Sequence, residues 1–304
     1  MKTNSRHTIT EPIGPYERHI HDVERTVVSG QTALQHFEIV ELFGYGPSLI
    51  LDGRVQSTAR DEAIYHEALL YPAYCLKQVV KRVLVLGGAN GGMLHRLRNL
   101  PNLKEVIQFD VDPELLPITR KHLPHMHRAV ESDSRMHVSF GDPRTLLSSL
   151  SGPFDLAICD LPDAIEGSRT TSLFTSEFYR DIKRLLNGTG VLATQAGPAN
   201  FLDAAFFASV LSTTRSVFLY AEPYSITVPS FGIPWGFVVA SDNIVPSSLT
   251  ESTIERCIDQ LFEQPFCYDL ATHRHLFSLP RHIRRALDSH GQVSSDKEPI
   301  YVTS

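Results

Sequence analysis

The chain has 304 residues, which is enough for one large α/β domain and a smaller appendage. Its net charge of -6 disfavours nucleic acid and anionic membranes as partners, and 42% hydrophobic residues is typical of a globular protein. No run approaches the ~20 apolar residues of a membrane helix, and the polar start MKTNSRHTITEPIG lacks the apolar segment of a signal peptide. We therefore expect a cytoplasmic protein with neither a nucleic-acid nor a membrane partner.

Residues 1–60 are expected to form a small β-strand domain. The runs HFEIVELF and PSLILDG alternate or are apolar, and the glycines of FGYGP separate them. The stretch ARDEAIYHEALLYPAYCLKQVV then predicts a helix, because Ala63, Ile64, Leu69 and Leu70 recur on one side.

Strands alternate with helices over residues 61–245, which predicts an α/β domain. Five near-continuous apolar runs are typical of parallel strands covered on both faces: VLVLGG, VIQFDVD, MHVSFGD, FDLAICD and GVLATQAG. FLYAEPYSITV and WGFVVASD are joined by PSFGIP, which is too short for a crossover helix, so we expect them to pair antiparallel. The pattern predicts a doubly wound sheet with an antiparallel edge strand, a helical extension over 246–290 and a polar tail over 291–304.

Acidic residues follow successive strands at their carboxyl ends, namely Asp110 and Asp112, Asp142, and Asp160 with Asp163. Ligands of open α/β sheets bind outside those ends. A single aspartate there can simply cap a helix, but the repetition indicates a binding site.

The stretch VLVLGGANGGMLHRL places four glycines where a strand would end and a helix begin. They do not fit G-x-G-x-x-G, so the nicotinamide-dinucleotide fingerprint is absent. Asp110 follows about 20 residues on, where an acid in this architecture accepts hydrogen bonds from ribose hydroxyls. A tight turn with a helix cap is the alternative, but the pattern favours a nucleoside ligand without a long phosphate chain.

The sequence as a whole resembles the spermidine synthase (polyamine aminopropyltransferase) family. The resemblance is carried, in order, by LILDGRVQSTARDEAIYHEALLYPA, VLVLGGANGGMLHRL, VIQFDVDPELL, FDLAICDLPDA, SLFTSEFYRDIKRLL, VLATQAGP and VPSFGIPWGFVVASD. It implies a class I methyltransferase-like Rossmann domain after a small β domain, usually in a homodimer. It also implies decarboxylated S-adenosylmethionine as co-substrate, a small-molecule amine as acceptor and no permanently bound cofactor.

The resemblance also implies roles for individual residues. For the donor these are Gln35 and Asp110 on the nucleoside, Asp142 on the adenine amino group, and the turn residues Gly88 and Asn90, with Gly167 at a family proline position. For the acceptor they are Asp160 as catalytic base, His66 and Asp163 as amine ligands, and Tyr65 and Gln195 as channel lining.

These residue types suit the implied chemistry. A sulfonium makes its neighbouring carbon electrophilic, so one amine displacement completes the transfer without a metal. Because alkyl amines are largely protonated at pH 7, a carboxylate in DLPD must take a proton. Asx-type turns are the alternative explanation for Asp160 and Asp163.

Three departures from the family pattern concern substrate choice. Asn90 replaces an aspartate that would pair with the ammonium of the decarboxylated donor and repel the carboxylate of S-adenosylmethionine. Pro143 removes a backbone N–H that usually contacts adenine. Phe231 stands where many relatives have tyrosine, and DAIEGS replaces a more proline-rich loop.

The sequence therefore leaves three functions in competition. The leading one is aminopropyl transfer to putrescine or another polyamine. Asn90 favours the alternative, a methyltransferase or 3-amino-3-carboxypropyltransferase that uses intact S-adenosylmethionine. The third is a binding protein that has lost catalysis, which the acids at 110, 160 and 163 disfavour.

The remaining motifs receive structural interpretations. The histidine pairs of HIH, HMH and HRH lack partners at metal-ligand spacing, so we expect surface histidines and no metal site. The cysteines show no paired spacing, which predicts buried reduced thiols at Cys75, Cys159, Cys257 and Cys267.

Overall fold

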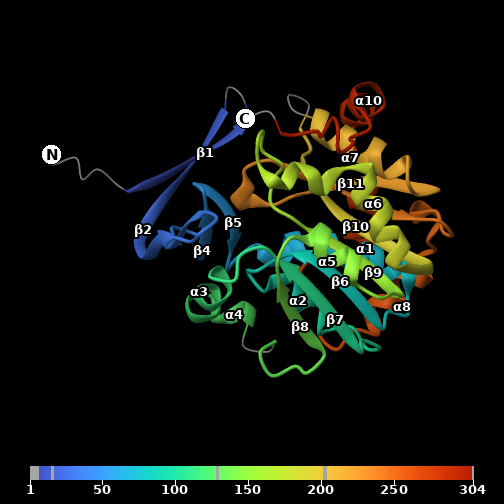
Figure 1. Ribbon diagram of the computed structural model, residues 1–304, viewed down its shortest axis with the longest axis horizontal. Helices are drawn as coiled ribbons and strands as arrows, with labels where there is room; N and C mark the ends of the chain where they lie inside the picture. Colours follow the sequence, from blue (N-terminus) through green and yellow to red (C-terminus); the bar gives the residue numbers. More distant parts are fainter. Residues whose placement is uncertain (1–6, 15–16, 128–129, 201–203, 303–304) are drawn as a thin grey trace.

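The computed structural model describes residues 7–14, 17–127, 130–200 and 204–302. Its first sheet is antiparallel and its strands follow chain order (Figure 1). They are β1 (Thr8–Gly14), β2 (Glu17–Gln31), β3 (His36–Leu42), β4 (Gly46–Leu51) and β5 (Arg54–Thr58). β2 is long enough to pair with β1 through its first half and with β3 through its second.

The second sheet has seven strands in the order β11-β12-β10-β9-β6-β7-β8. Their bounds are β6 (Arg82–Gly87), β7 (Glu105–Asp110), β8 (Met136–Phe140), β9 (Phe154–Asp160), β10 (Leu186–Pro198), β11 (Tyr220–Thr227) and β12 (Pro234–Ser241). β6 to β10 are parallel, and β12 runs antiparallel to both β10 and β11. The predicted doubly wound sheet and the antiparallel pair are confirmed, with β12 one position in from the edge strand β11.

Helices cover both faces of this sheet because its strands are apolar on both sides. Val83 and Val85 of β6 belong to one core, and Leu84 and Leu86 belong to the other. The first core is closed by α1 (Glu62–Lys77), α2 (Gly92–Leu97), α8 (Glu251–Asp259) and α9 (Leu270–Phe277). The second is closed by α5 (Pro143–Ser149), α6 (Ser176–Leu185), α7 (Ala205–Arg215) and α10 (Arg281–His290).

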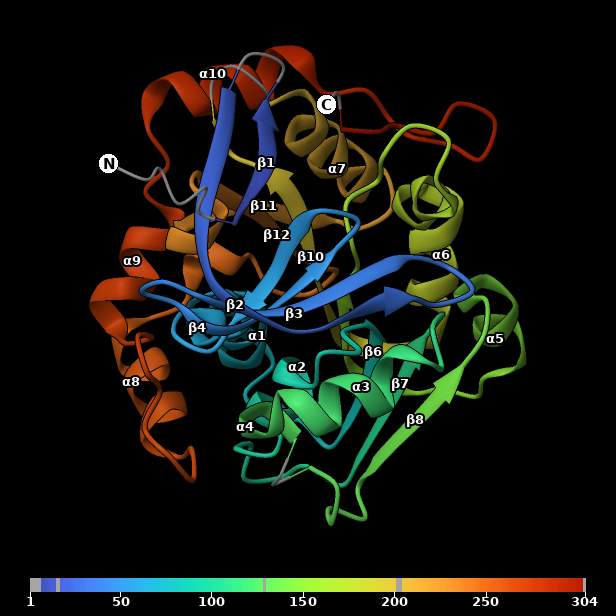
Figure 2. The same cartoon turned by 90° about the vertical axis from the view of Figure 1, so that its left-hand side faces the viewer.

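The first sheet lies over the carboxyl ends of the parallel strands. Phe37 and Ile39 of β3 pack in one cluster with Ala89 of the glycine turn, with Leu115 of α3 (Leu115–His122) and with Met126 of α4 (Pro124–His127). Figure 2 shows the first sheet above α3 and α4. The edge where the acids gather is thereby covered by the N-terminal strands.

The stretch expected as a polar tail is docked onto the second domain. Ser294 is fully buried, and its carbonyl accepts a hydrogen bond from Ser176 N at 2.9 Å. Val302 N donates to Ala164 O at 2.7 Å. The tail therefore contacts both ends of the segment that follows β9. None of the helices in the described part of the chain combines the length and hydrophobicity needed to cross a membrane.

Candidate active site

The glycine turn after β6 is flanked by an acid from each neighbouring strand. Asp110 ends β7, and its Oδ2 accepts a hydrogen bond from Ala89 N at 3.1 Å. Asp160 ends β9, where it pairs with Gly87 in the sheet. A Cβ on Gly88 would lie 2.8 Å from Asp160 Oδ2, so only glycine leaves room for that carboxylate. The sheet therefore brings Gly88, Asp110 and Asp160 together.

Asp110 is held rigidly at the turn. Besides Ala89 N it accepts from Asp112 N at 3.0 Å, and only 8% of its surface is exposed. Burial raises the pKa of Asp110 to about 6, although the backbone hydrogen bonds act in the opposite direction. A buried carboxylate fixed by two N–H groups is well suited to accept the two hydroxyls of a ribose.

Gln35 reaches the same region from the first sheet through a neighbour of Asp110. Its Nε2 donates to Asp112 Oδ2 at 2.8 Å, and Thr32 Oγ1 donates to the same oxygen at 2.7 Å. Asp112 is 1% exposed, so these bonds are buried. The sequence placed Asp112 at the strand end but did not predict that it fastens the first sheet to the second.

Asp142 and Pro143 lie at the start of α5, one strand further along the same edge. Asp142 Oδ1 caps the helix by accepting from Arg144 N at 2.9 Å, and the preceding Gly141 N donates to Asp110 O at 3.0 Å. Pro143 is buried and opens the helix, so the N–H absent from its ring is one that the helix does not use. Gly167 differs, because it is exposed with a φ of 75°, and a Cβ at this position would meet no described atom within 4 Å.

Asn90 uses its side-chain oxygen within the turn. Oδ1 accepts from Gly92 N at 2.9 Å, which leaves the Nδ2 hydrogens as the donors that can face a ligand. An aspartate at this position could accept the same bond and would add a negative charge.

Asp160 is the least satisfied acid at the turn. It is 8% exposed, and its Oδ2 has no hydrogen-bond partner among the described residues. Burial raises the pKa of Asp160, while His66 and the Tyr65 hydroxyl lower it. A buried carboxylate oxygen without a partner is costly unless a ligand uses it.

His66 connects Asp160 to a second buried acid. Its Nε2 lies 3.8 Å from Asp160 Oδ2, and its Nδ1 lies 2.8 Å from Glu62 Oε2. Although burial lowers the pKa of His66, the hydrogen bond and charge of Glu62 raise it above the usual value. Arg96 in turn binds Glu62. Sequence analysis missed Glu62, although its position four residues before His66 in one helix places both on the same side.

Aromatic side chains continue the site beyond Asp160. The Tyr65 ring lies 5.8 Å from that of Phe231, and Phe231 lies 4.9 Å from Trp235. Asp163 Oδ2 is 3.9 Å from Arg54 Nη1, so this acid already has a cation nearby. Gln195 is 1% exposed, and its amide is occupied by Leu161 O and Gly197 N, at 3.0 and 2.7 Å. Gln195 thus supports the segment after Asp160 through the backbone.

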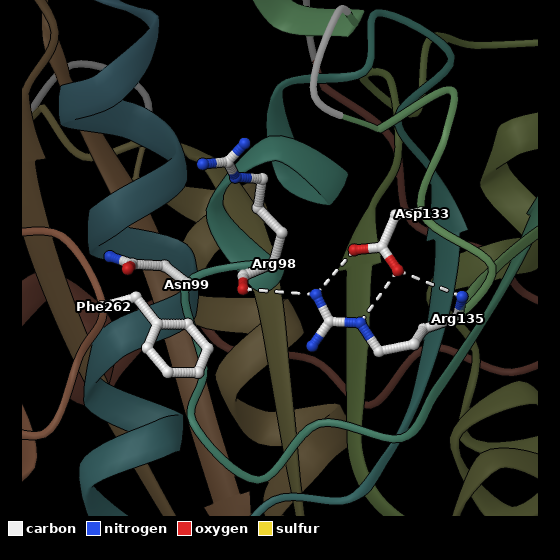
Figure 3. Close-up of a pocket in the computed structure, with 5 residues that line it drawn as sticks. All are labelled: Arg98, Asn99, Asp133, Arg135 and Phe262. Atoms are coloured by element: carbon white, nitrogen blue, oxygen red, sulfur yellow. Dashed lines mark hydrogen bonds and ion pairs between the residues drawn. The ribbon is translucent and has the colours of Figure 1, made fainter.

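A cavity of about 250 Å³ lies elsewhere, between the end of α2 and the start of β8 (Figure 3). Arg135 donates to Asp133 through Nε and Nη2, and Arg98 pairs with Glu263. Because both guanidinium groups are already neutralised, this cavity offers no free charge for an anion.

The histidine pairs were predicted to be surface residues, and that prediction is wrong for one member of each pair. His21, His127 and His273 are at most 6% exposed. His127 lies behind the glycine turn, where its Nε2 is 3.1 Å from Thr119 Oγ1. Within the ranges that the structure covers, no three His, Cys, Asp or Glu side chains are grouped to hold a metal ion. The four cysteines are free thiols, and all but Cys267 are buried.

Fold and site together define a nucleoside-binding protein of the class I methyltransferase-like Rossmann type, and comparisons with known proteins identify the family. A family model described as "Spermine/spermidine synthase domain" matches residues 62–250. Polyamine aminopropyltransferase 2 of Hyperthermus butylicus is 34% identical over 284 residues, covering 93% of each chain. Polyamine aminopropyltransferase of Sulfolobus acidocaldarius is 34% identical over 288 residues, covering 94% of this chain and 95% of the relative.

Solved structures agree on the fold. Spermidine synthase from Thermotoga maritima superposes with a TM-score of 0.84 at 24% identity, covering 93% of this chain and 95% of that one. A spermidine synthase in complex with the transition state analogue AdoDATO also gives 0.84, at 23% identity. The chain belongs to the spermine/spermidine synthase family, which confirms the resemblance found in the sequence.

Proposed function

We propose that this protein is an aminopropyltransferase that moves an aminopropyl group from decarboxylated S-adenosylmethionine to a small-molecule amine. The names of the relatives support this activity. The observation that carries it is the buried, unpartnered Oδ2 of Asp160 at the glycine turn. An incoming amine gives that oxygen the hydrogen-bond donor it lacks.

The donor occupies the turn and the strand ends on the β7 side. Asp110 accepts the ribose hydroxyls, and Gln35 closes over them from the first sheet. The adenine lies at the start of α5, beside Asp142 and Pro143, where the proline offers it no N–H. No metal enters the proposed reaction, because the sulfonium already activates the carbon.

The transfer is a single displacement. The amine nitrogen forms a bond to the aminopropyl carbon next to sulfur, the carbon–sulfur bond breaks, and its electron pair stays on methylthioadenosine. Asp160 accepts the proton that the amine loses, and its raised pKa makes it a stronger base than an exposed aspartate. His66, supported by Glu62, orients Asp160 and stabilises its charge.

The acceptor reaches Asp160 along the aromatic side of the site. Tyr65 and Phe231 contact its methylene groups, and Asp163 and His66 bound the place of its reacting nitrogen. Gln195 acts through the backbone of Leu161.

Offering decarboxylated S-adenosylmethionine with a panel of diamines and polyamines tests the proposal. Chromatography should show methylthioadenosine and an acceptor heavier by one aminopropyl group. Absence of both products with every acceptor in the panel contradicts it.

A second candidate uses intact S-adenosylmethionine, and Asn90 favours it. The free Nδ2 of Asn90 can donate to a donor carboxylate that an aspartate would repel. Calorimetry with each donor separates the candidates, because binding of the decarboxylated donor that is more than a hundredfold tighter excludes the second.

We also propose a homodimer and a cytoplasmic location. Ile20, Leu34 and Phe43 of the first sheet and its loops are 60%, 47% and 55% exposed, which supports association through that sheet. Light scattering of the purified protein tests the dimer.

A further inference from the structure

A buried acid of the first sheet lies close to the acceptor side of the site. Glu11 of β1 is 8% exposed, and its Oε2 accepts one hydrogen bond, from Val55 N at 3.3 Å. His21 Nε2 lies 3.9 Å from the same oxygen, which is too far for a hydrogen bond. We call Glu11, His21 and the neighbouring His19 the hairpin cluster.

The hairpin cluster carries an acid that no cation neutralises directly. His21 is not that cation, because burial and the neighbouring His19 lower the pKa of His21 to about 4. Arg54 is occupied differently, since its Nη1 donates to Pro12 O at 3.4 Å and lies 3.9 Å from Asp163. Burial raises the pKa of Glu11 to about 7, as expected for a carboxyl without a counter-ion.

Polar atoms without partners mark the cluster as a place for a ligand. His19 Nδ1 and His21 Nε2 are buried and have no hydrogen-bond partner within the described ranges, and His21 is 4% exposed. Both rings are neutral at pH 7 and can each accept a hydrogen bond from an ammonium group. Such atoms are rarely left unpaired unless a ligand or water fills the space.

The cluster adjoins the aromatic side of the acceptor site. A Cβ on Gly232 would lie 2.6 Å from His19 Nδ1, so the His19 ring sits directly on this residue. Gly232 follows Phe231, whose ring packs beside Tyr65. An aromatic wall therefore joins the carboxylate of Asp160 at one end to the hairpin cluster at the other.

We propose that Glu11 and His21 form a subsite for the far nitrogen of the acceptor, so that the enzyme selects linear amines with a second cationic centre. This inference rests on the proposed function. The reacting nitrogen lies at Asp160, the methylene groups lie along Tyr65 and Phe231, and the far ammonium donates to Glu11 and His21. Because Arg54 lies at Asp163, Glu11 is the acid that remains for that ammonium.

Calorimetry of the Glu11→Gln variant tests the subsite. With methylthioadenosine present, we expect its affinity for 1,4-diaminobutane and for a linear triamine to fall by about tenfold to hundredfold, the cost of one charged hydrogen bond. Affinity for n-butylamine, which has no second nitrogen, should not change. In turnover the variant should show a raised KM for the diamine and an unchanged kcat, because Glu11 does not touch the reacting atoms.

Two control variants keep the result interpretable. Glu17→Gln removes an exposed acid from the same hairpin and should bind every amine like the unmodified protein. Glu11→Asp keeps the charge on a shorter side chain and should give intermediate affinity, which covers the case in which Glu11→Gln does not fold.

The outcomes separate the subsite from the proposed function. Equal affinity of the Glu11→Gln and unmodified proteins for the diamine and triamine overturns the subsite, as does an equal loss for n-butylamine. Loss of diamine binding without any aminopropyl transfer by the unmodified protein overturns the proposed function and leaves the subsite standing. An unmodified protein that binds no amine overturns both.

Discussion

The carboxylates of Asp110 and Asp160 meet consecutive residues of one turn. Asp110 Oδ2 accepts from Ala89 N at 3.1 Å, and Asp160 Oδ2 lies 2.8 Å from the place of a Cβ on Gly88. The two acids come from strands on opposite sides of β6. Donor and acceptor are thus brought together by two residues of backbone.

Replacing Asp160 by asparagine should abolish most of the activity. The amide cannot accept the proton of the amine, so we expect kcat to fall by about 10²–10⁴ while donor affinity changes little. Release of methylthioadenosine measures the first quantity and calorimetry the second. Asp259→Asn, at an exposed position on α8, is the matched control. A kcat within threefold of the unmodified enzyme would show that Asp160 is not the base.

Replacing Asn90 by aspartate should sharpen the choice of donor. The new carboxylate can still accept from Gly92 N, pairs with the ammonium of the decarboxylated donor and repels the carboxylate of the intact one. One charged hydrogen bond is worth about 1.5–3 kcal/mol, so the ratio of the two dissociation constants should rise about tenfold to hundredfold. Asn102→Asp adds the same charge at an exposed position and should leave the ratio unchanged.

Asp110 should make stability depend on pH. Its pKa is raised from 3.8 to about 6, so its contribution to stability is fully present below pH 3.8 and is lost as the pH rises through 6. A shift of about two units corresponds to about 3 kcal/mol. Relative to Asp110→Asn, the free energy of unfolding of the unmodified protein should therefore fall by about that amount between pH 4 and pH 8. Urea titrations at both values measure it, and a constant difference contradicts the raised pKa.

Replacing Pro143 by alanine should restore an N–H at the adenine site. We expect KM for the donor to fall by up to about tenfold, the value of one neutral hydrogen bond. Stability should decrease by about 0.4–1 kcal/mol, because the unfolded chain gains freedom. Pro246→Ala, which also removes a proline from the start of a helical turn, should show only the loss of stability. An unchanged KM in Pro143→Ala would place adenine elsewhere.

The docked tail should influence both substrates. Asp296 accepts from Arg144 Nη2 at 2.9 Å and from Thr175 Oγ1 at 2.7 Å, and so joins the start of α5 to the segment after β9. We expect Asp296→Ala to raise KM for donor and acceptor by about two- to tenfold, with kcat nearly unchanged, in steady-state assays. The double variant Arg144→Asp/Asp296→Arg should recover most of the loss, and failure to do so would argue against the ion pair.

Much of the fold could be predicted because buried parallel strands have a plain local pattern. FDLAICD is apolar on both faces and became β9, and the short link PSFGIP required an antiparallel pair. The position of β12 inside the edge could not be predicted, since the order of strands depends on contacts far apart in the chain.

The site was predictable only where strand ends fix it. Asp110 and Asp160 follow from their strands, whereas Glu11 comes from a hairpin whose path over the site has no local signal. Buried His127 was missed because its burial is produced by packing against Gly91, which lies in another element. Asp163 was expected to be open to an amine, but Arg54 of the first sheet lies beside it.

The two hydrogen bonds from Thr32 and Gln35 to Asp112 fasten the first sheet two residues beyond the ribose-binding acid. Departure of the spent nucleoside and rocking of the N-terminal strands therefore draw on the same latch. In such an arrangement, the pace of product escape would be set by how often that latch opens, and weakening it would speed turnover while loosening the grip on the incoming donor.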